Sequence, residues 1–146
     1  MKTIAFGCDH GGFAMKYAVI SHLQKSGYKV IDCGCDSTVS VDYPEYADRV
    51  CKAITNKDAD LGILICGTGL GMSIAANKHK GIRASACENT FSARMTREHN
   101  DANVLCLGAR VIGAGLALDM VDLFVTTEFA GGRHQKRVDM LNELDD

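Results

Sequence analysis

The sequence contains no tryptophan, a single proline and little net charge: its 16 basic and 18 acidic residues leave −2. Such an even balance excludes a global field that would attract the chain to nucleic acid or to an anionic membrane surface. No apolar run approaches the roughly 20 residues that a membrane-spanning helix needs. We therefore expect no nucleic-acid partner and no membrane association, and any affinity for an anion must come from a local cluster of residues.

Several motifs of known chemistry are also missing. No Walker A lysine follows the glycines, no nucleophile elbow with a Ser-His-Asp order is present, and no His, Asp or Glu spacing suggests a metal site. The seven cysteines include no paired C-x-x-C spacing of the kind that binds zinc. Residues 1–6 are too short and too soon interrupted to form a signal peptide. We expect a cytoplasmic protein with reduced thiols. The cysteines expected to pack in apolar strands are Cys8, Cys66, Cys87 and Cys106.

Short apolar runs alternate with longer amphipathic segments along the 146 residues, 47% of which are hydrophobic. Strands are predicted over 3–7, 28–32, 61–66, 82–87 and 104–107, and helices over 13–25, 43–55, 71–78, 90–98, 113–124 and 133–144. Strands separated by helices indicate right-handed crossovers and a parallel sheet that is covered on both faces. The sequence predicts an α/β fold in which residues 1–146 form a single doubly wound, Rossmann-like domain. It has a five-stranded parallel sheet and a C-terminal helix.

The most informative stretch is the junction after the apolar run 61–66. Cys66 ends that run, and Gly67, Gly69 and Gly71 follow it before the chain resumes as small and apolar residues. Glycines at a strand-to-helix junction let main-chain N–H groups approach a negative charge, and the start of a helix also lowers the pKa of a nearby thiol. A dinucleotide site would need its third glycine one residue later. A smaller anion, a developing oxyanion or simple close packing remain the interpretations of this turn.

In doubly wound sheets, ligands bind beyond the carboxyl ends of the strands. That rule brings Asp9 and His10 to the same edge as Cys66, together with Glu88 and Arg110. Asp9 either faces a ligand there or caps the helix that follows it.

Four further residues have a functional and a plain interpretation. His99 is suited to acid–base chemistry near neutral pH, or it only makes a favourable interaction with the dipole at the C-terminus of its helix. Arg133 and Arg137 are four apart on one helix face, where they could grip a phosphate or form a solvated basic surface. Tyr43 could contact a ligand or pack against the protein.

Taken together, these motifs resemble those of the type B ribose-5-phosphate isomerases, a family that includes isomerases of allose 6-phosphate and galactose 6-phosphate. The resemblance covers nearly the whole chain. The residues that carry it are GCDHGG at 7–12, DYP at 42–44, CGTGLGMSIAANK at 66–78, His99–Asn100, LGAR at 107–110 and Arg133-x-x-x-Arg137.

The resemblance implies interconversion of ribose 5-phosphate and ribulose 5-phosphate through an enediolate, without a metal or an organic cofactor. Cys66 would be the base, and the turn from Gly67 to Ser73, with Thr68, would stabilise the enediolate oxygens. His99 would open the furanose ring, with Asp9 holding a hydroxyl.

The resemblance also implies the substrate contacts and the assembly. The phosphate would be held by His10, Arg133 and Arg137, with Arg110 as a further candidate. Tyr43 and Asn100 would contact the sugar. The partners expected are a small sugar phosphate and a second copy of the chain, in a dimer or a tetramer. The alternatives are an isomerase of a six-carbon aldose 6-phosphate and a non-catalytic module that binds a nucleotide or phosphate.

Overall fold

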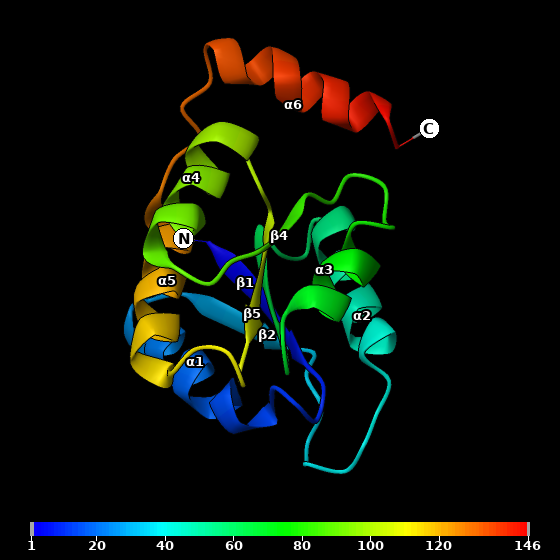
Figure 1. The fold of residues 1–146 in the computed structure, drawn as a ribbon, viewed down its shortest axis with the longest axis vertical. Helices are drawn as coiled ribbons and strands as arrows, with labels where there is room; N and C mark the ends of the chain where they lie inside the picture. Colours follow the sequence, from blue (N-terminus) through cyan, green and yellow to red (C-terminus); the bar gives the residue numbers. More distant parts are fainter. Residues whose placement is uncertain (1, 146) are drawn as a thin grey trace.

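The computed structural model describes residues 2–145 and has three layers, with a five-stranded parallel sheet between two layers of helices (Figure 1). The doubly wound α/β prediction is confirmed. The strands are β1 (Thr3–Cys8), β2 (Lys29–Asp32), β3 (Leu61–Cys66), β4 (Ala84–Ala86) and β5 (Val104–Gly108). The helices are α1 (Phe13–Lys25), α2 (Tyr43–Thr55), α3 (Leu70–Ala76), α4 (Thr90–Asn100), α5 (Ala114–Thr126) and α6 (Arg133–Glu143).

The sheet has the strand order β2-β1-β3-β5-β4 with every pair parallel. Helices α1, α4 and α5 cover one face, and α2 and α3 cover the other (Figure 1). The three central strands, β1, β3 and β5, are almost completely buried. Burial on both faces explains why these strands appear in the sequence as continuous apolar runs rather than as alternating patterns.

Strand β4 is shorter than predicted, because it begins at Ala84 rather than at Ile82. Ile82 donates its N–H to the carbonyl of His79 in a turn, and Arg83 donates its N–H to the Asn103 side chain. Both N–H groups therefore have partners outside the sheet. The strand lies at the sheet edge and pairs only with β5, so no second neighbour extends it.

The chain order reverses direction between β1 and β3, which are adjacent in the sheet. The connection from β1 leads outward to β2, whereas the connection from β3 leads toward the opposite edge. The carboxyl ends of β1 and β3 therefore border the crevice where ligands bind in folds of this kind. Helix α6 lies at the other end of the sheet, above α4 (Figure 1).

Candidate active site

The sulfur of Cys66 lies at the crevice and accepts a main-chain hydrogen bond. Cys66 is the last residue of β3, and its Sγ is 3.1 Å from the N–H nitrogen of Gly69. Gly69 has φ +81°, and a Cβ there would lie 3.0 Å from the carbonyl carbon of Leu107. Only glycine fits this position without strain. The turn thus directs one main-chain donor at the sulfur of Cys66.

The turn after Cys66 leaves two N–H groups for a ligand. The N–H of Leu70 donates to Oγ1 of Thr68 at 3.2 Å. The carbonyls of Cys66 and Gly67 accept hydrogen bonds from the main-chain N–H groups of Ala109 and Arg110. Among residues 2–145, none accepts a hydrogen bond from the N–H groups of Gly67 and Thr68. Within the described chain, these two donors therefore have no hydrogen-bond partner, as donors reserved for an oxyanion would.

Two glycines of the turn make room for larger side chains. A Cβ at Gly67 would lie 3.3 Å from a guanidinium nitrogen of Arg110, and one at Gly71 would lie 2.7 Å from the ring of Tyr43. Arg110 and Tyr43 thus lie against the turn. The side chain of Ser73 binds within its own helix. Its hydroxyl donates a hydrogen bond to the carbonyl of Leu70 at 2.8 Å.

Asp9 follows β1 and is buried, and it organises the turn into α1. Its Oδ1 accepts hydrogen bonds from the N–H groups of Gly11 at 2.9 Å and Gly12 at 3.2 Å. A Cβ at Gly11 would lie 2.9 Å from the main-chain nitrogen of Gly67, so this turn is in contact with the turn after Cys66. Asp9 therefore holds the turn that precedes α1 and does not cap the helix, because the N-cap of α1 is Gly12 and no side chain caps it.

His10 is oriented by a residue that the sequence did not single out. Its Nδ1 accepts a hydrogen bond from the N–H of Val41 at 3.1 Å, across 31 positions of the chain. An imidazole that accepts at Nδ1 carries its proton on Nε2 when neutral. His10 therefore presents an N–H donor on the other side of its ring and anchors the loop between β2 and α2.

The remaining predicted residues, His99, Asn100, Arg133 and Arg137, lie at the opposite end of the sheet. Helix α4 runs back along the sheet and ends just before β5 begins. In the ladder, Gly62 pairs with Val104 and Cys66 pairs with Gly108, so the ends of these strands are roughly 13 Å apart. Helix α6 is at that far end too (Figure 1). Within one chain, the four residues do not reach Cys66.

These residues form a second cluster with His134 of α6. The rings of His99 and His134 stack with centroids 4.2 Å apart and planes 13° apart. Desolvation lowers the pKa of His134, and the nearby His99, Arg133 and Arg137 lower it further. The lowered pKa favours the neutral form of His134, which lies beside two exposed arginines. The sequence placed it only in a basic helix face, and its contact with His99 depends on the tertiary fold.

Burial raises the pKa of most other cysteines, as expected for thiols that pack as apolar groups. The pKa of Cys8 is raised to about 12 by burial and by Cys35, and burial raises that of Cys51 to about 12 and that of Cys87 to about 11. Burial also places the pKa of Cys106 well above its ordinary value. These thiols stay protonated near neutral pH and are poor candidates for a base.

Two features are absent from residues 2–145. No group of three or more His, Cys, Asp or Glu side chains is placed to hold a metal ion. No helix in this part of the chain is long and apolar enough to cross a membrane.

The fold and the site define a class: a doubly wound α/β domain with a cysteine and a glycine-rich turn at the crevice between β1 and β3. Comparison with known proteins then identifies the family. The model of the Ribose/Galactose Isomerase family matches residues 4–141, and the chain belongs to this family.

Relatives and solved structures agree with this assignment. The chain is 50% identical over 145 residues to ribose-5-phosphate isomerase B of Escherichia coli, covering 99% of this chain and 97% of that protein. The structure of Clostridium thermocellum ribose-5-phosphate isomerase B matches with TM-score 0.96 and 52% identity, over 98% of this chain and 97% of that one. A Thermotoga maritima ribose 5-phosphate isomerase matches with TM-score 0.95 and 49% identity, over 97% and 98% of the two chains. The predicted family is confirmed, and the protein is an isomerase.

Proposed function

We propose that this enzyme interconverts ribose 5-phosphate and ribulose 5-phosphate through an enediolate, with Cys66 as the base. The observation that carries the proposal is the hydrogen bond from Gly69 N–H to Cys66 Sγ, beside the two N–H groups that Gly67 and Thr68 leave available. The reaction is the aldose–ketose step of the pentose phosphate pathway. Relatives that are 50% and 52% identical carry the name ribose-5-phosphate isomerase B, which supports this substrate.

In the forward reaction, the Cys66 thiolate removes the proton from C2 of the open-chain aldose. The electron pair left on carbon forms the enediolate, and negative charge develops on the former aldehyde oxygen. The N–H groups of Gly67 and Thr68 would stabilise this charge, which exists only during turnover. A proton passes from the C2 hydroxyl to the C1 oxygen, and the thiol returns its proton to C1, which gives the ketose with its carbonyl at C2 and restores the thiolate.

Ring opening and phosphate binding are assigned mainly to the second cluster, which contains His99, Arg133 and Arg137. Ribose 5-phosphate is a furanose in solution, so a proton must move at the ring oxygen before enolisation, and His99 is the group proposed for this step. His10, Arg133 and Arg137 would hold the phosphate, with Arg110 beside the turn, and Asn100 would contact the sugar. Asp9 is proposed to hold a hydroxyl through the oxygen that does not accept from Gly11 and Gly12.

We infer that a second copy of the chain completes the site. His99, Arg133 and Arg137 lie at the sheet end remote from Cys66, so an antiparallel dimer would place one copy's cluster over the other's crevice. Apolar side chains suited to such an interface are exposed at Leu70 and Ile74 on α3. We also infer a cytoplasmic setting, because a catalytic thiol requires a reducing compartment.

The test is steady-state kinetics of the pure protein on ribose 5-phosphate and on allose 6-phosphate, with ketose formation as the readout. We expect turnover of both substrate types to depend on the phosphate, with kcat/KM higher for ribose 5-phosphate. A higher value for allose 6-phosphate would assign the enzyme to six-carbon substrates. Binding of ribose 5-phosphate without any ketose would refute the isomerase proposal and leave a binding module.

A further inference from the structure

We propose that Arg83 is a positioning residue, which fixes His99 and Asn100 relative to the phosphate-binding arginines of α6. This inference rests on the proposed function, because it assigns ring opening to His99. Arg83 belongs to none of the motifs that carry the family resemblance, and it comes just before β4. Its importance follows from what its side chain joins.

The guanidinium of Arg83 connects the end of α4 to α6. Its Nε lies 3.1 Å from the carbonyl oxygen of Asn100 and 3.2 Å from that of Asp101, and one terminal nitrogen donates to the same Asp101 carbonyl at 2.8 Å. The other terminal nitrogen donates to Oδ1 of Asn142 on α6 at 2.9 Å. One planar group thus binds the last carbonyls of the helix that bears His99 and the helix that bears Arg133 and Arg137.

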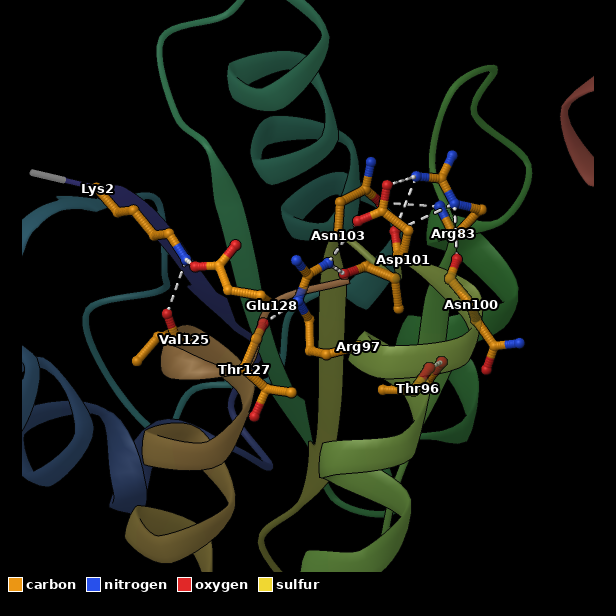
Figure 2. A network of polar contacts seen from close by, with 12 residues as sticks. Lys2, Arg83, Thr96, Arg97, Asn100, Asp101, Asn103, Val125, Thr127 and Glu128 are labelled. Atoms are coloured by element: carbon orange, nitrogen blue, oxygen red, sulfur yellow. Dashed lines mark hydrogen bonds and ion pairs between the residues drawn. The ribbon is translucent and has the colours of Figure 1, made fainter. Parts of the chain in front are cut away.

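Asp101 makes this connection specific. It ends α4 in the left-handed conformation, with φ 46°, which is uncommon for non-glycine residues although aspartate adopts it more readily than most. Figure 2 shows Asp101 between the side chains of Arg83 and Arg97. Arg97 donates to Oδ1 of Asp101 at 2.9 Å, and Arg83 is 3.6 Å from Oδ2. Arg97 is itself buried and also donates to the carbonyls of Ala102 and Thr127. Arg83 therefore acts on a helix end whose other side is already fixed.

Helix α6 has few other attachments, so this link carries more weight than a surface hydrogen bond usually does. Val138 is its only buried residue within the described chain. A cavity of about 420 Å³ separates it from the β4 edge, and Arg83, Asn100 and Asn142 are among the residues that line it. Two hydrogen bonds link the two sides of this space, one from Arg83 to Asn142 and one from the N–H of Gly81 to Asp145 just after the helix, and both contribute to the position of α6. The stack of His99 on His134 also depends on that position.

The experiment compares Arg83→Gln and Arg83→Lys with the control Arg94→Gln. Arg94 is on α4, the helix that bears His99, and there it pairs with Glu98 and lies over the ring of Phe91 on the exposed face. A lysine keeps the charge but cannot bind several acceptors in one plane. Asn142→Ala removes the α6 half of the link alone. Each variant is assayed for kcat and KM with ribose 5-phosphate, and for exchange of solvent deuterium into C1 of ribulose 5-phosphate, which needs enolisation but no ring opening.

We expect both Arg83 variants to lower kcat on ribose 5-phosphate by about 10- to 100-fold, because displacement of His99 slows ring opening. Their kcat for deuterium exchange should stay near that of the wild type. Asn142→Ala should raise KM for both substrates and leave kcat unchanged. Amide hydrogen exchange of residues 97–103 and 138–144 should be faster in the Arg83 variants than in Arg94→Gln.

The proposal is overturned if the Arg83 variants match Arg94→Gln in kcat on ribose 5-phosphate or in amide hydrogen exchange. It is equally overturned if ring opening and deuterium exchange fall together, because that pattern indicates general damage to the fold. A wild-type protein without turnover would refute the proposed function instead. In that case the amide exchange still decides whether Arg83 holds the two helix ends.

Discussion

Gly69 follows Cys66 by three residues, and its main-chain N–H donates a hydrogen bond to the Cys66 sulfur, with 3.1 Å between nitrogen and sulfur. The left-handed conformation of Gly69 brings this N–H back toward the end of β3. At the same time, this residue begins α3, so the sulfur also lies near the positive end of a helix. The backbone of the turn, rather than a charged side chain, is what distinguishes Cys66 from the buried thiols around it.

Gly69→Ala tests this backbone arrangement. A Cβ at this position is strained at φ +81° and would lie 3.0 Å from the carbonyl carbon of Leu107, so the N–H must move away from Cys66. We expect kcat to fall by about 10- to 100-fold and the free energy of unfolding to fall by about 1–2 kcal/mol. Gly81→Ala is the matched control, because its φ is +82° and a Cβ there has nothing within 4 Å. That variant should lose similar stability while it keeps full activity, as measured by denaturant unfolding and by ketose formation. Equal activity of the two variants would contradict the role given to Gly69.

Subunit complementation tests whether the site is shared between two copies. Cys66→Ala and Arg137→Ala should each be inactive or strongly impaired, since each removes a different half of the site. A mixed dimer carries both defects in one site and none in the other. Random reassortment after co-refolding makes half of the dimers mixed and should restore about a quarter of wild-type activity. If the mixture stays as inactive as its components, the complete site lies within one chain.

Thiol alkylation tests which cysteine is available as a thiolate. At pH 8, a thiol with a pKa of about 12, such as Cys8 or Cys51, is ionised to only about one part in ten thousand. Since a raised pKa delays ionisation to higher pH, labelling of these two should increase about tenfold for each pH unit above 8. We expect iodoacetamide at pH 8 to label Cys66 ahead of them, with parallel loss of activity and protection by ribose 5-phosphate.

Peptide mass spectrometry gives the site of labelling. Cys33→Ser provides a background without the half-buried thiol, the least buried of the seven. Labelling of Cys8 or Cys51 at the rate of Cys66 would contradict the assignment.

Much of the fold could be predicted because its signals are local. The runs that became β1, β3 and β5 are apolar over their whole length, and a strand buried on both faces requires that pattern. The strand 82–87 was predicted too long, because the turn at Ile82 and the side chain of Asn103 withdraw two residues from the edge. Nothing local in the sequence predicts those contacts.

The candidate site likewise has a part that is local in the sequence and a part that depends on the tertiary fold. Cys66 and its glycines are adjacent in the sequence, so the turn could be predicted from them. The bond between His10 and Val41 spans 31 positions, and the stack of His99 on His134 depends on how α6 folds over α4. The separation of His99 from Cys66 follows from the direction of α4 along the sheet, which the residue types do not encode.

The most direct test of the central claim is the initial rate of ribulose 5-phosphate formation from saturating ribose 5-phosphate by the wild type and by Cys66→Ala. Inorganic phosphate binding by both proteins serves as the control for a folded site. A general base in this role accelerates a reaction by about 100- to 10,000-fold. The kcat of the variant should therefore fall by at least about 100-fold, while the variant binds phosphate normally. Near-normal turnover by Cys66→Ala would contradict the account, because the proton would then move without the thiol.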